Sequence, residues 1–339
     1  MSEAPQRIAV LRALGGIGDV LTAVPALRRL RARWPEALVT YIGLPQVEGV
    51  VARYPHLVDR FLAFPGFPGV PEHRFTPTAL AEWLHARASE PRFDLAVQMH
   101  GSGSVSNVFA GLLGAERLLA YHVPGLWKPA SDSPPFPDAL SEVDRWLALI
   151  ETVGCSEGGS RAEFPLSPFE LAEARSLVSG RYAVVHAGAS DPVRRWPPAR
   201  FAAIADQLAR DGLRVVLTGT PNEMPVVAAV RAAMTEAALD LCGRTSLGVA
   251  AALVAGAEVT VTNDTGTSHI AAALGSPSVV IFIASDPARW APADARRHRA
   301  VGVGVGDPPI GSTTPKRPPS HPSVDEVLAA VDALLKVPA

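Results

Sequence analysis

The sequence predicts an α/β protein of two doubly wound, parallel-sheet domains that face each other across a cleft. At 339 residues the chain is long enough for two domains, at roughly 150 residues each. Its composition is 48% hydrophobic, which is enough for each domain to form its own core. Short, β-prone apolar runs alternate along the chain with longer amphipathic segments, a pattern typical of parallel α/β sheets.

Strands and helices are expected to alternate along both halves. The expected strands are residues 7–12, 38–42, 58–64 and 94–99, then 181–186, 214–218, 258–261 and 277–283. Apolar residues spaced three and four apart predict helices at 20–33, 141–153, 197–210, 223–235, 246–255 and 324–335.

Proline and glycine collect between the halves and predict a boundary near residues 155–180. We place the two domains at 1–165 and 166–339. A second proline-rich run, 307–322, precedes the last helix, which is long enough to pack across either domain or both.

Charge and cysteine content narrow the function classes. The 31 basic and 33 acidic residues leave a formal net charge of -2, which gives no sign of a nucleic-acid-binding surface. Cys155 and Cys242 are the only cysteines, which disfavours a disulfide framework or a cysteine-rich zinc module and is typical of a reducing cytosol. Residues 1–7 lack the features of a secretion signal, and the longest apolar stretch, 247–257, is shorter than the ~18 residues that a spanning helix needs. We expect a cytoplasmic enzyme, with at most a peripheral membrane contact.

Ligands of doubly wound sheets bind beyond the carboxyl ends of the strands, so the loops there carry the candidate site. The first loop, 13–19, is rich in glycine and ends at Asp19, where the first long helix is about to begin. Its glycines match neither the G-x-G-x-x-G nor the Walker A pattern, which disfavours NAD and ATP. Asp19 is either a helix cap or a general base that removes a proton from a substrate hydroxyl.

Two loops in the second half suit a nucleotide. After strand 181–186, small residues expose backbone N–H groups and the guanidiniums of Arg194 and Arg195 follow. This combination suits a diphosphate, and the alternative is a solvated basic loop. Glu223, after strand 214–218, either accepts hydrogen bonds from ribose hydroxyls or favours the start of its helix.

The loop 262–269 has the densest cluster of polar residues. It leads into a helix whose N-terminus favours an anion at Thr265–Ser268. Asp264 would repel a phosphate, so its expected partners are hydroxyls of a sugar or ribose. The alternative is an Asx-turn with helix capping, and a His269 that only packs.

Taken together and in this order, these loops resemble glycosyltransferase family 9, the heptosyltransferase-like enzymes of lipopolysaccharide assembly. The resemblance covers nearly the whole chain. It rests on Gly18-Asp19-Val20-Leu21 with Pro25-Ala26-Leu27-Arg28, on residues 186–201 with their Arg-Trp-Pro, and on residues 262–274, which read Asn-Asp-Thr-Gly-x-x-His after Thr262. One departure is Arg194, where the family commonly has Lys, which keeps the charge and changes how it meets a phosphate.

The resemblance implies a GT-B fold with an N-terminal acceptor-binding domain and a C-terminal nucleotide-sugar-binding domain. It also implies an inverting transfer without metal or other cofactor, with ADP-heptose as the favoured donor and a glycan or other small molecule as acceptor. Asp19 matches the proposed catalytic base. The implied donor residues are Ser190, Arg194, Arg195, Glu223, Asp264, Thr265, Gly266, Thr267, Ser268 and His269, and those on the acceptor side are Gly18, His100 and Ser102.

Other functions stay open at this point. A nucleotide-sugar epimerase or hydrolase of the same fold would consume donor without an acceptor, and a sugar-nucleotide-binding protein would bind it without turnover. The loop around His100 and Ser102 is alternatively an ordinary Gly-Ser turn. The arginines at 28, 29, 31 and 33 are interpreted as a solvated face near the end of their helix.

Overall fold

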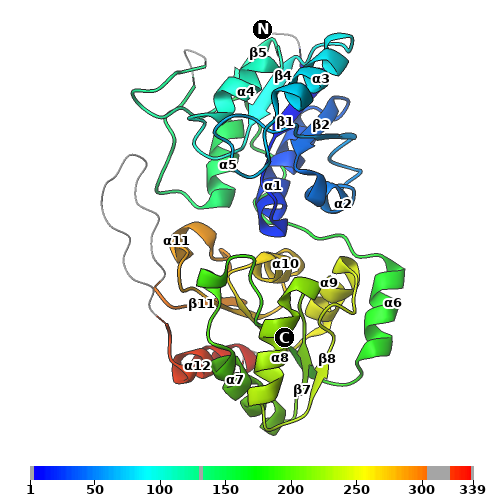
Figure 1. Cartoon of the computed structure of the whole chain (residues 1–339), viewed down its shortest axis with the longest axis vertical. Coiled ribbons are helices and arrows are strands. Elements are labelled where there is room, and N and C mark those ends of the chain that lie inside the picture. The colour runs from blue at the N-terminus through cyan, green and yellow to red at the C-terminus, as the bar shows by residue number, and fades with distance from the viewer. Residues whose placement is uncertain (1–3, 130–132, 304–320, 337–339) are drawn as a thin grey trace. The chain divides into compact units, whose positions relative to one another are not determined.

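The computed structural model describes residues 4–129, 133–303 and 321–336, and the chain divides into two compact units, Met1–Ala162 and Glu163–Ala339 (Figure 1). The division comes after residue 162, where the sequence analysis puts it after residue 165. Residues 307–320 of the second proline-rich run lie outside the described residues.

The first unit contains a parallel sheet with the strand order β3-β2-β1-β4-β5. Leu11 of β1 lies opposite Ile42 of β2 on one side and Gln98 of β4 on the other. The carboxyl ends of β1 and β4 are therefore neighbours, and so are the loops that follow them. The strands are β1 (Arg7–Leu11), β2 (Leu38–Gly43), β3 (Arg60–Ala63), β4 (Leu95–Gln98) and β5 (Arg117–Leu119).

Helices cover both faces of this sheet. Ala9 and Leu11 belong to a core with Phe109 of α4 and partly buried residues of α3. Because successive side chains of a strand alternate, Ile8 and Val10 point to the opposite face, where α1 packs with α5. The helices are α1 (Ile17–Arg33), α2 (Glu48–Val51), α3 (Pro77–Ala88), α4 (Ser106–Leu112) and α5 (Glu142–Glu151), with the 3-10 helix η1 (Pro45–Val47).

The second unit contains a parallel sheet with the strand order β11-β10-β9-β6-β7-β8. Its four inner strands, in the order β10, β9, β6 and β7, end side by side and bring four loops together at one edge. The strands are β6 (Tyr182–His186), β7 (Arg214–Leu217), β8 (Ala238–Asp240), β9 (Val259–Asn263), β10 (Ser278–Ile281) and β11 (His298–Val301).

One core of the second unit is built by α7, α8 and the last helix, α12, which packs beside α7 and against the sheet (Figure 1). Val327 and Val331 bring α12 into this core. On the other face, α9 contacts α6 and α10. The helices are α6 (Pro168–Leu177), η2 (Pro192–Arg194), α7 (Pro198–Arg210), η3 (Pro221–Glu223), α8 (Met224–Ala233), α9 (Leu247–Gly256), α10 (Gly266–Leu274), α11 (Pro287–Trp290) and α12 (Val324–Leu335).

In the described part of the chain, no helix is both long and apolar enough to cross a membrane.

Candidate functional site

Asp19 lies in the first turn of α1, directly after the glycine loop that follows β1. Its Oδ2 accepts the N–H of Gly16 at 3.1 Å, so one oxygen of the carboxylate caps the helix as one reading of the sequence expects. A Cβ on Gly16 would lie 2.6 Å from this oxygen, which explains why a glycine stands there. The Asp19 side chain remains 21% exposed.

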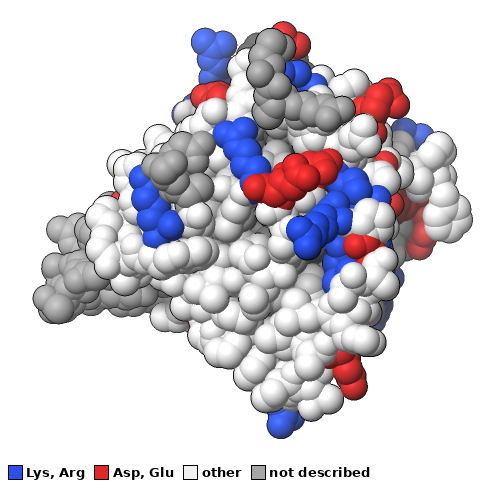
Figure 2. All heavy atoms as spheres, turned by 90° about the horizontal axis from the view of Figure 1, so that it is seen from above, with Lys and Arg blue, Asp and Glu red and all other residues white. Residues whose placement is uncertain are grey.

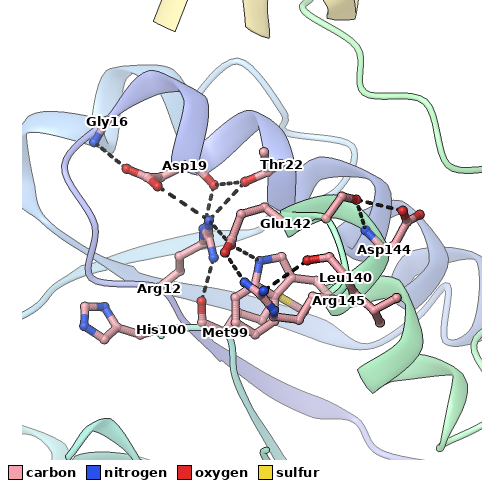
Figure 3. A network of polar contacts seen from close by, with 12 residues as sticks. Arg12, Gly16, Asp19, Thr22, Met99, His100, Leu140, Glu142, Asp144 and Arg145 are labelled. Carbon is pink, nitrogen blue, oxygen red and sulfur yellow. Dashed lines mark hydrogen bonds and ion pairs between the residues drawn. The ribbon is translucent and has the colours of Figure 1, made fainter. Parts of the chain in front are cut away.

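Arg12, directly after β1, is the charged group that approaches the other oxygen of Asp19 (Figure 3). Its side chain is 0% exposed, and its Nη2 lies 3.6 Å from Asp19 Oδ1. It donates to the backbone carbonyls of Asp19 and Met99 and to the hydroxyl of Thr22. Sequence reasoning missed Arg12, because an arginine at a strand end is more often exposed than buried.

The N-terminus of α5 completes this buried network, as Figure 3 shows. The Glu142 carboxylate lies 3.5 Å from Nη2 of Arg12, pairs with Arg145, and accepts the indole N–H of Trp146 at 3.1 Å. The Arg12 guanidinium lies over the Trp146 ring, 5.1 Å from its centre. Arg145 in turn donates to the carbonyls of Pro137 and Leu140. The charges buried here are therefore paired and hydrogen-bonded.

The loop that follows β4 contains His100 and lies beside the loop of Asp19. The Gln98 side chain holds this loop from inside, because it accepts the N–H of His100 and donates to Ser106 and Asn107. Ser102 and the exposed Ser104 keep their hydroxyls toward the surface, 3.5 Å apart.

His100 itself is 9% exposed, and its Nδ1 has no hydrogen-bond partner among the described residues. Burial, and secondarily the charge of Arg12, lowers the pKa of His100 to about 4. The imidazole is thus neutral at pH 7 and offers an unused nitrogen beside the Asp19 loop.

In the second unit, Asn263 ties two of the four loops together. Its side chain accepts the N–H of Trp196 at 3.0 Å and donates to the carbonyls of Ala187 and Gly188. Asn263 is fully buried at the end of β9. It therefore holds the loop after β6 against the loop that carries Asp264.

Arg194 and Asp264 are brought together by these loops. Nη1 of Arg194 lies 3.9 Å from the Asp264 carboxylate, and Nη2 donates to Ser190 at 2.9 Å. Asp264 also accepts the hydroxyl of Ser285, which lies in the loop after β10, at 2.5 Å. Sequence reasoning missed Ser285, because a serine after a strand carries no signal of its own. Arg195 behaves differently from Arg194, since two of its nitrogens donate to the carbonyl of Ala189.

The N-terminus of α10 presents the remaining polar residues of the loop after β9. Thr265 is the N-cap residue but makes no side-chain cap, and Thr265, Gly266 and Thr267 are partly exposed. First-turn N–H groups of a helix lack intrahelical partners, so they can bind an anion here. Ser268 is buried and donates to the Thr265 carbonyl, and the ring of His269 stands edge-on to Trp290 at 6.1 Å.

Glu223 is buried at the start of the segment after β7. It accepts the N–H and hydroxyl of Thr220, which is the helix-start role that the sequence allows. Its other oxygen lies 3.8 Å from Nε2 of His186 and against Gly188, where a Cβ would overlap it. Burial lowers the pKa of His186.

The structure therefore groups the sequence-predicted residues in two places. Gly18, Asp19, His100 and Ser102 follow the adjacent strands β1 and β4 of the first unit, and the predicted donor residues follow β6, β7 and β9 of the second. Arg28, Arg29 and Arg31 are not a merely solvated face. They donate to backbone carbonyls, and Arg28 and Arg29 thereby bind segment 158–161 to α1.

The sequence is similar to a family of glycosyltransferases and to several of its members. The model of the family "Glycosyltransferase family 9 (heptosyltransferase)" matches residues 92–308. Lipopolysaccharide heptosyltransferase 2 of Salmonella typhimurium is 26% identical over 302 residues, covering 80% of this chain and 81% of the relative. Lipopolysaccharide heptosyltransferase 1 of Escherichia coli is 35% identical over 111 residues, 32% of this chain and 34% of that protein.

Two solved structures share the fold over almost the whole chain. A family 9 glycosyl transferase from Veillonella parvula superposes with a TM-score of 0.78 at 21% identity, covering 99% of this chain and 98% of the other. The E. coli ADP-heptose lipopolysaccharide heptosyltransferase II gives 0.72 at 22% identity, covering 97% and 98%. The expected GT-B fold, two Rossmann-like domains, is thereby confirmed.

Proposed function

The chain belongs to glycosyltransferase family 9, and on that premise we propose that it is an inverting, metal-independent enzyme that transfers heptose from ADP-heptose to a hydroxyl of a glycan acceptor. The acceptor side is the first unit, and the donor side is the second. The observation that carries the proposal is the pair of loop clusters at the strand ends of the two units: a part-exposed carboxylate in one and an Arg-lined helix N-terminus in the other.

In this mechanism Asp19 accepts the proton of the acceptor hydroxyl as that oxygen forms a bond to the anomeric carbon of heptose. The bond from this carbon to the diphosphate breaks on the opposite face, so the configuration inverts. Negative charge grows on the departing diphosphate, and Arg194 with the first turn of α10 stabilises it. The carboxylate of Asp264, which accepts a hydrogen bond from Ser285, also accepts hydrogen bonds from the sugar hydroxyls.

The part of the chain that the structure describes has no group of three or more His, Cys, Asp or Glu side chains that could hold a metal ion. In the proposed mechanism, guanidinium and backbone N–H donors stabilise the leaving group.

We also propose that the enzyme works in the cytoplasm with a peripheral contact to the inner membrane, through an exposed apolar patch of the first unit. The patch is defined by Val108, Leu112, Leu126 and Trp127. Val108 and Leu112 lie four residues apart on α4, and Trp127 approaches the same helix near Gly111.

A lipid surface suits this patch better than a protein. Four side chains are far fewer than the roughly 20 residues that each side of a stable protein interface contributes. Trp127 is 54% exposed and is followed by the exposed Lys128, a pairing that suits the boundary of an anionic bilayer. The patch also lies on the helix that begins at the loop of His100, on the proposed acceptor side.

The test of the function has two steps. Calorimetric titration with ADP, GDP, UDP, TDP and NAD is expected to select ADP, because ADP is the leaving group of the proposed donor. A ligand that binds only the native state also raises its stability, by an amount that grows with the logarithm of the affinity. The protein is then incubated with ADP-heptose and candidate glycan acceptors, and ADP release and the glycosylated product are measured. ADP release without acceptor would instead favour a hydrolase, and binding without turnover a non-catalytic protein.

Asp19→Asn is the matched variant for this test. The amide oxygen still accepts the N–H of Gly16, so the helix cap is kept, while the basic carboxylate is lost. Transfer should fall by about 1,000-fold or more with ADP affinity unchanged. Loss of ADP binding together with turnover would indicate that Asp19 acts only on the fold.

A further inference from the structure

We propose that Arg12 is a positioning residue for Asp19, and that Glu142 on α5 holds Arg12 in place. The inference rests on the proposed role of Asp19 and adds two residues to the acceptor side. Neither residue touches the reacting atoms, so both act through the geometry of the carboxylate.

The hydrogen bonds of Arg12 hold the backbone and the neighbours of Asp19, and none of them goes to the carboxylate. Nε donates to the Asp19 carbonyl at 2.5 Å, Nη1 to the Met99 carbonyl at 2.6 Å, and Nη2 to the Thr22 hydroxyl at 3.0 Å. These contacts fix the first turn of α1 to the end of β4, the strand that leads into the loop of His100.

The two oxygens of Asp19 have different surroundings as a result. Oδ2 accepts the N–H of Gly16, whereas Oδ1 lies 3.6 Å from Nη2 of Arg12, which is beyond hydrogen-bond range. Among the described residues, Oδ1 accepts no hydrogen bond. Oδ1 is therefore the oxygen that takes the proton when the acceptor O–H bond breaks, and Arg12 keeps it oriented by charge without occupying it.

The burial of this network also favours a positioning role. Buried ion pairs contribute little net stability, because the desolvation of the charges offsets their attraction, and apolar side chains of similar volume often do as well. Yet Arg12, Glu142 and Arg145 are all almost fully buried, with the indole of Trp146 packed on Arg12. The network reaches the surface at the carboxylate of Asp19, and supporting groups of this kind are what hold a reactive side chain in place.

The experiment compares Arg12→Gln, Arg12→Lys and Glu142→Gln in the full chain. Arg29→Lys is the control, because Arg29 lies on α1 as Asp19 does but pairs with Glu151, away from Asp19. For each protein we would measure kcat and the KM values of donor and acceptor, and we would determine a crystal structure.

Arg12→Gln should lower kcat about 10- to 100-fold, as a small misplacement of a reactive group does, and leave the donor KM nearly unchanged. Arg12→Lys should recover part of the loss, because the charge returns without the forked donor geometry. The kcat of Glu142→Gln should lie between those of Arg12→Gln and wild type, and the kcat of Arg29→Lys should match that of wild type. In the Arg12→Gln crystal structure, Oδ1 of Asp19 should be displaced from its position in the wild-type structure.

Wild-type kcat in Arg12→Gln would overturn the inference, as would a kcat loss that only follows the loss of folded protein. If Arg12→Gln does not fold, Arg12→Lys decides on the same criteria. If the wild-type chain transfers no sugar, the proposed function fails, and the crystal structures alone decide: an unmoved Asp19 carboxylate overturns the positioning role, and a displaced one supports it.

Discussion

At the scale of single residues, the two readings of Asp19 are not exclusive. One carboxylate oxygen caps α1, and the other stays available beside a buried cation. The sequence predicts the loop and the acid because a glycine-rich turn between a strand and a helix has a clear pattern. It does not predict Arg12 or Glu142, since 130 positions separate them and their burial depends on how α5 packs against α1.

His100 makes stability depend on pH in a defined direction. The pKa of His100 is about 4 in the folded protein and about 6.5 when unfolded. Its contribution to the free energy of unfolding is therefore complete above pH 6.5 and is lost as the pH falls toward 4. The full effect is about 3 kcal/mol. His100→Gln should remove this part of the acid destabilisation. Urea unfolding at pH 7.5 and pH 5 captures about 2 kcal/mol of it, and an equal pH effect in both proteins would contradict the assignment.

Arg194 and Arg195 should differ although they are neighbours. Arg194→Gln should weaken ADP binding about tenfold and reduce its salt dependence, because a charge-assisted contact is lost. Arg195→Gln should mainly lower the free energy of unfolding, since Arg195 supports the Ala189 carbonyl. Calorimetry at two salt concentrations distinguishes the two variants. Equal losses of ADP affinity at equal stability would show that both arginines contact the diphosphate.

At the scale of elements, the strongest patterns were the most predictable. The eight expected strands are all present. Seven of them are inner strands, which in a parallel sheet are continuous apolar runs, and the eighth, β3, is an edge strand with no fully buried residue. The apolar pattern does not predict β5, β8 and β11, which are short edge strands with partly exposed residues. It predicts the start of the first helix at residue 20, whereas α1 starts at Ile17 because Gly16 serves as its cap. That difference places Asp19 inside the first turn.

The joining of two loops by Asn263 can be tested separately. Asn263→Ala leaves the buried N–H of Trp196 and the carbonyls of Ala187 and Gly188 without this partner, and should lower the free energy of unfolding by about 2–4 kcal/mol. The control is Asn222→Ala, at an exposed position of the same unit, which should stay within about 0.5 kcal/mol of wild type. Similar losses in the two variants would mean that the joining contacts contribute little.

At the scale of the molecule, charge gives little guidance to the partner. On the face seen in Figure 2, acidic and basic side chains lie side by side and most of the surface is uncharged, in keeping with the formal net charge of -2. The apolar patch was not predictable, because exposed Leu and Trp look like core residues in a sequence. Only the packing of α4 and the loop after β5 leaves them outside.

The patch predicts binding to anionic vesicles. Wild-type protein should sediment with vesicles that contain phosphatidylglycerol and less with phosphatidylcholine alone. Changing Leu126 and Trp127 together to Ala should reduce the bound fraction about tenfold. Phe169→Ala is the control, since Phe169 is 74% exposed on α6 of the second unit. Unchanged binding in the double variant, or none in wild type, would exclude the patch as a membrane contact.

The arginines of α1 have a mechanical consequence for the chain between the units. Because Arg28 and Arg29 bind the carbonyls of 158–161, the connection to α6 begins after Arg161 and has only residues 162–167. Six residues span about 20 Å at full extension. By holding residues 158–161 on α1, the two arginines therefore shorten the reach of the connection, and the start of α6 stays within about this distance of Arg161.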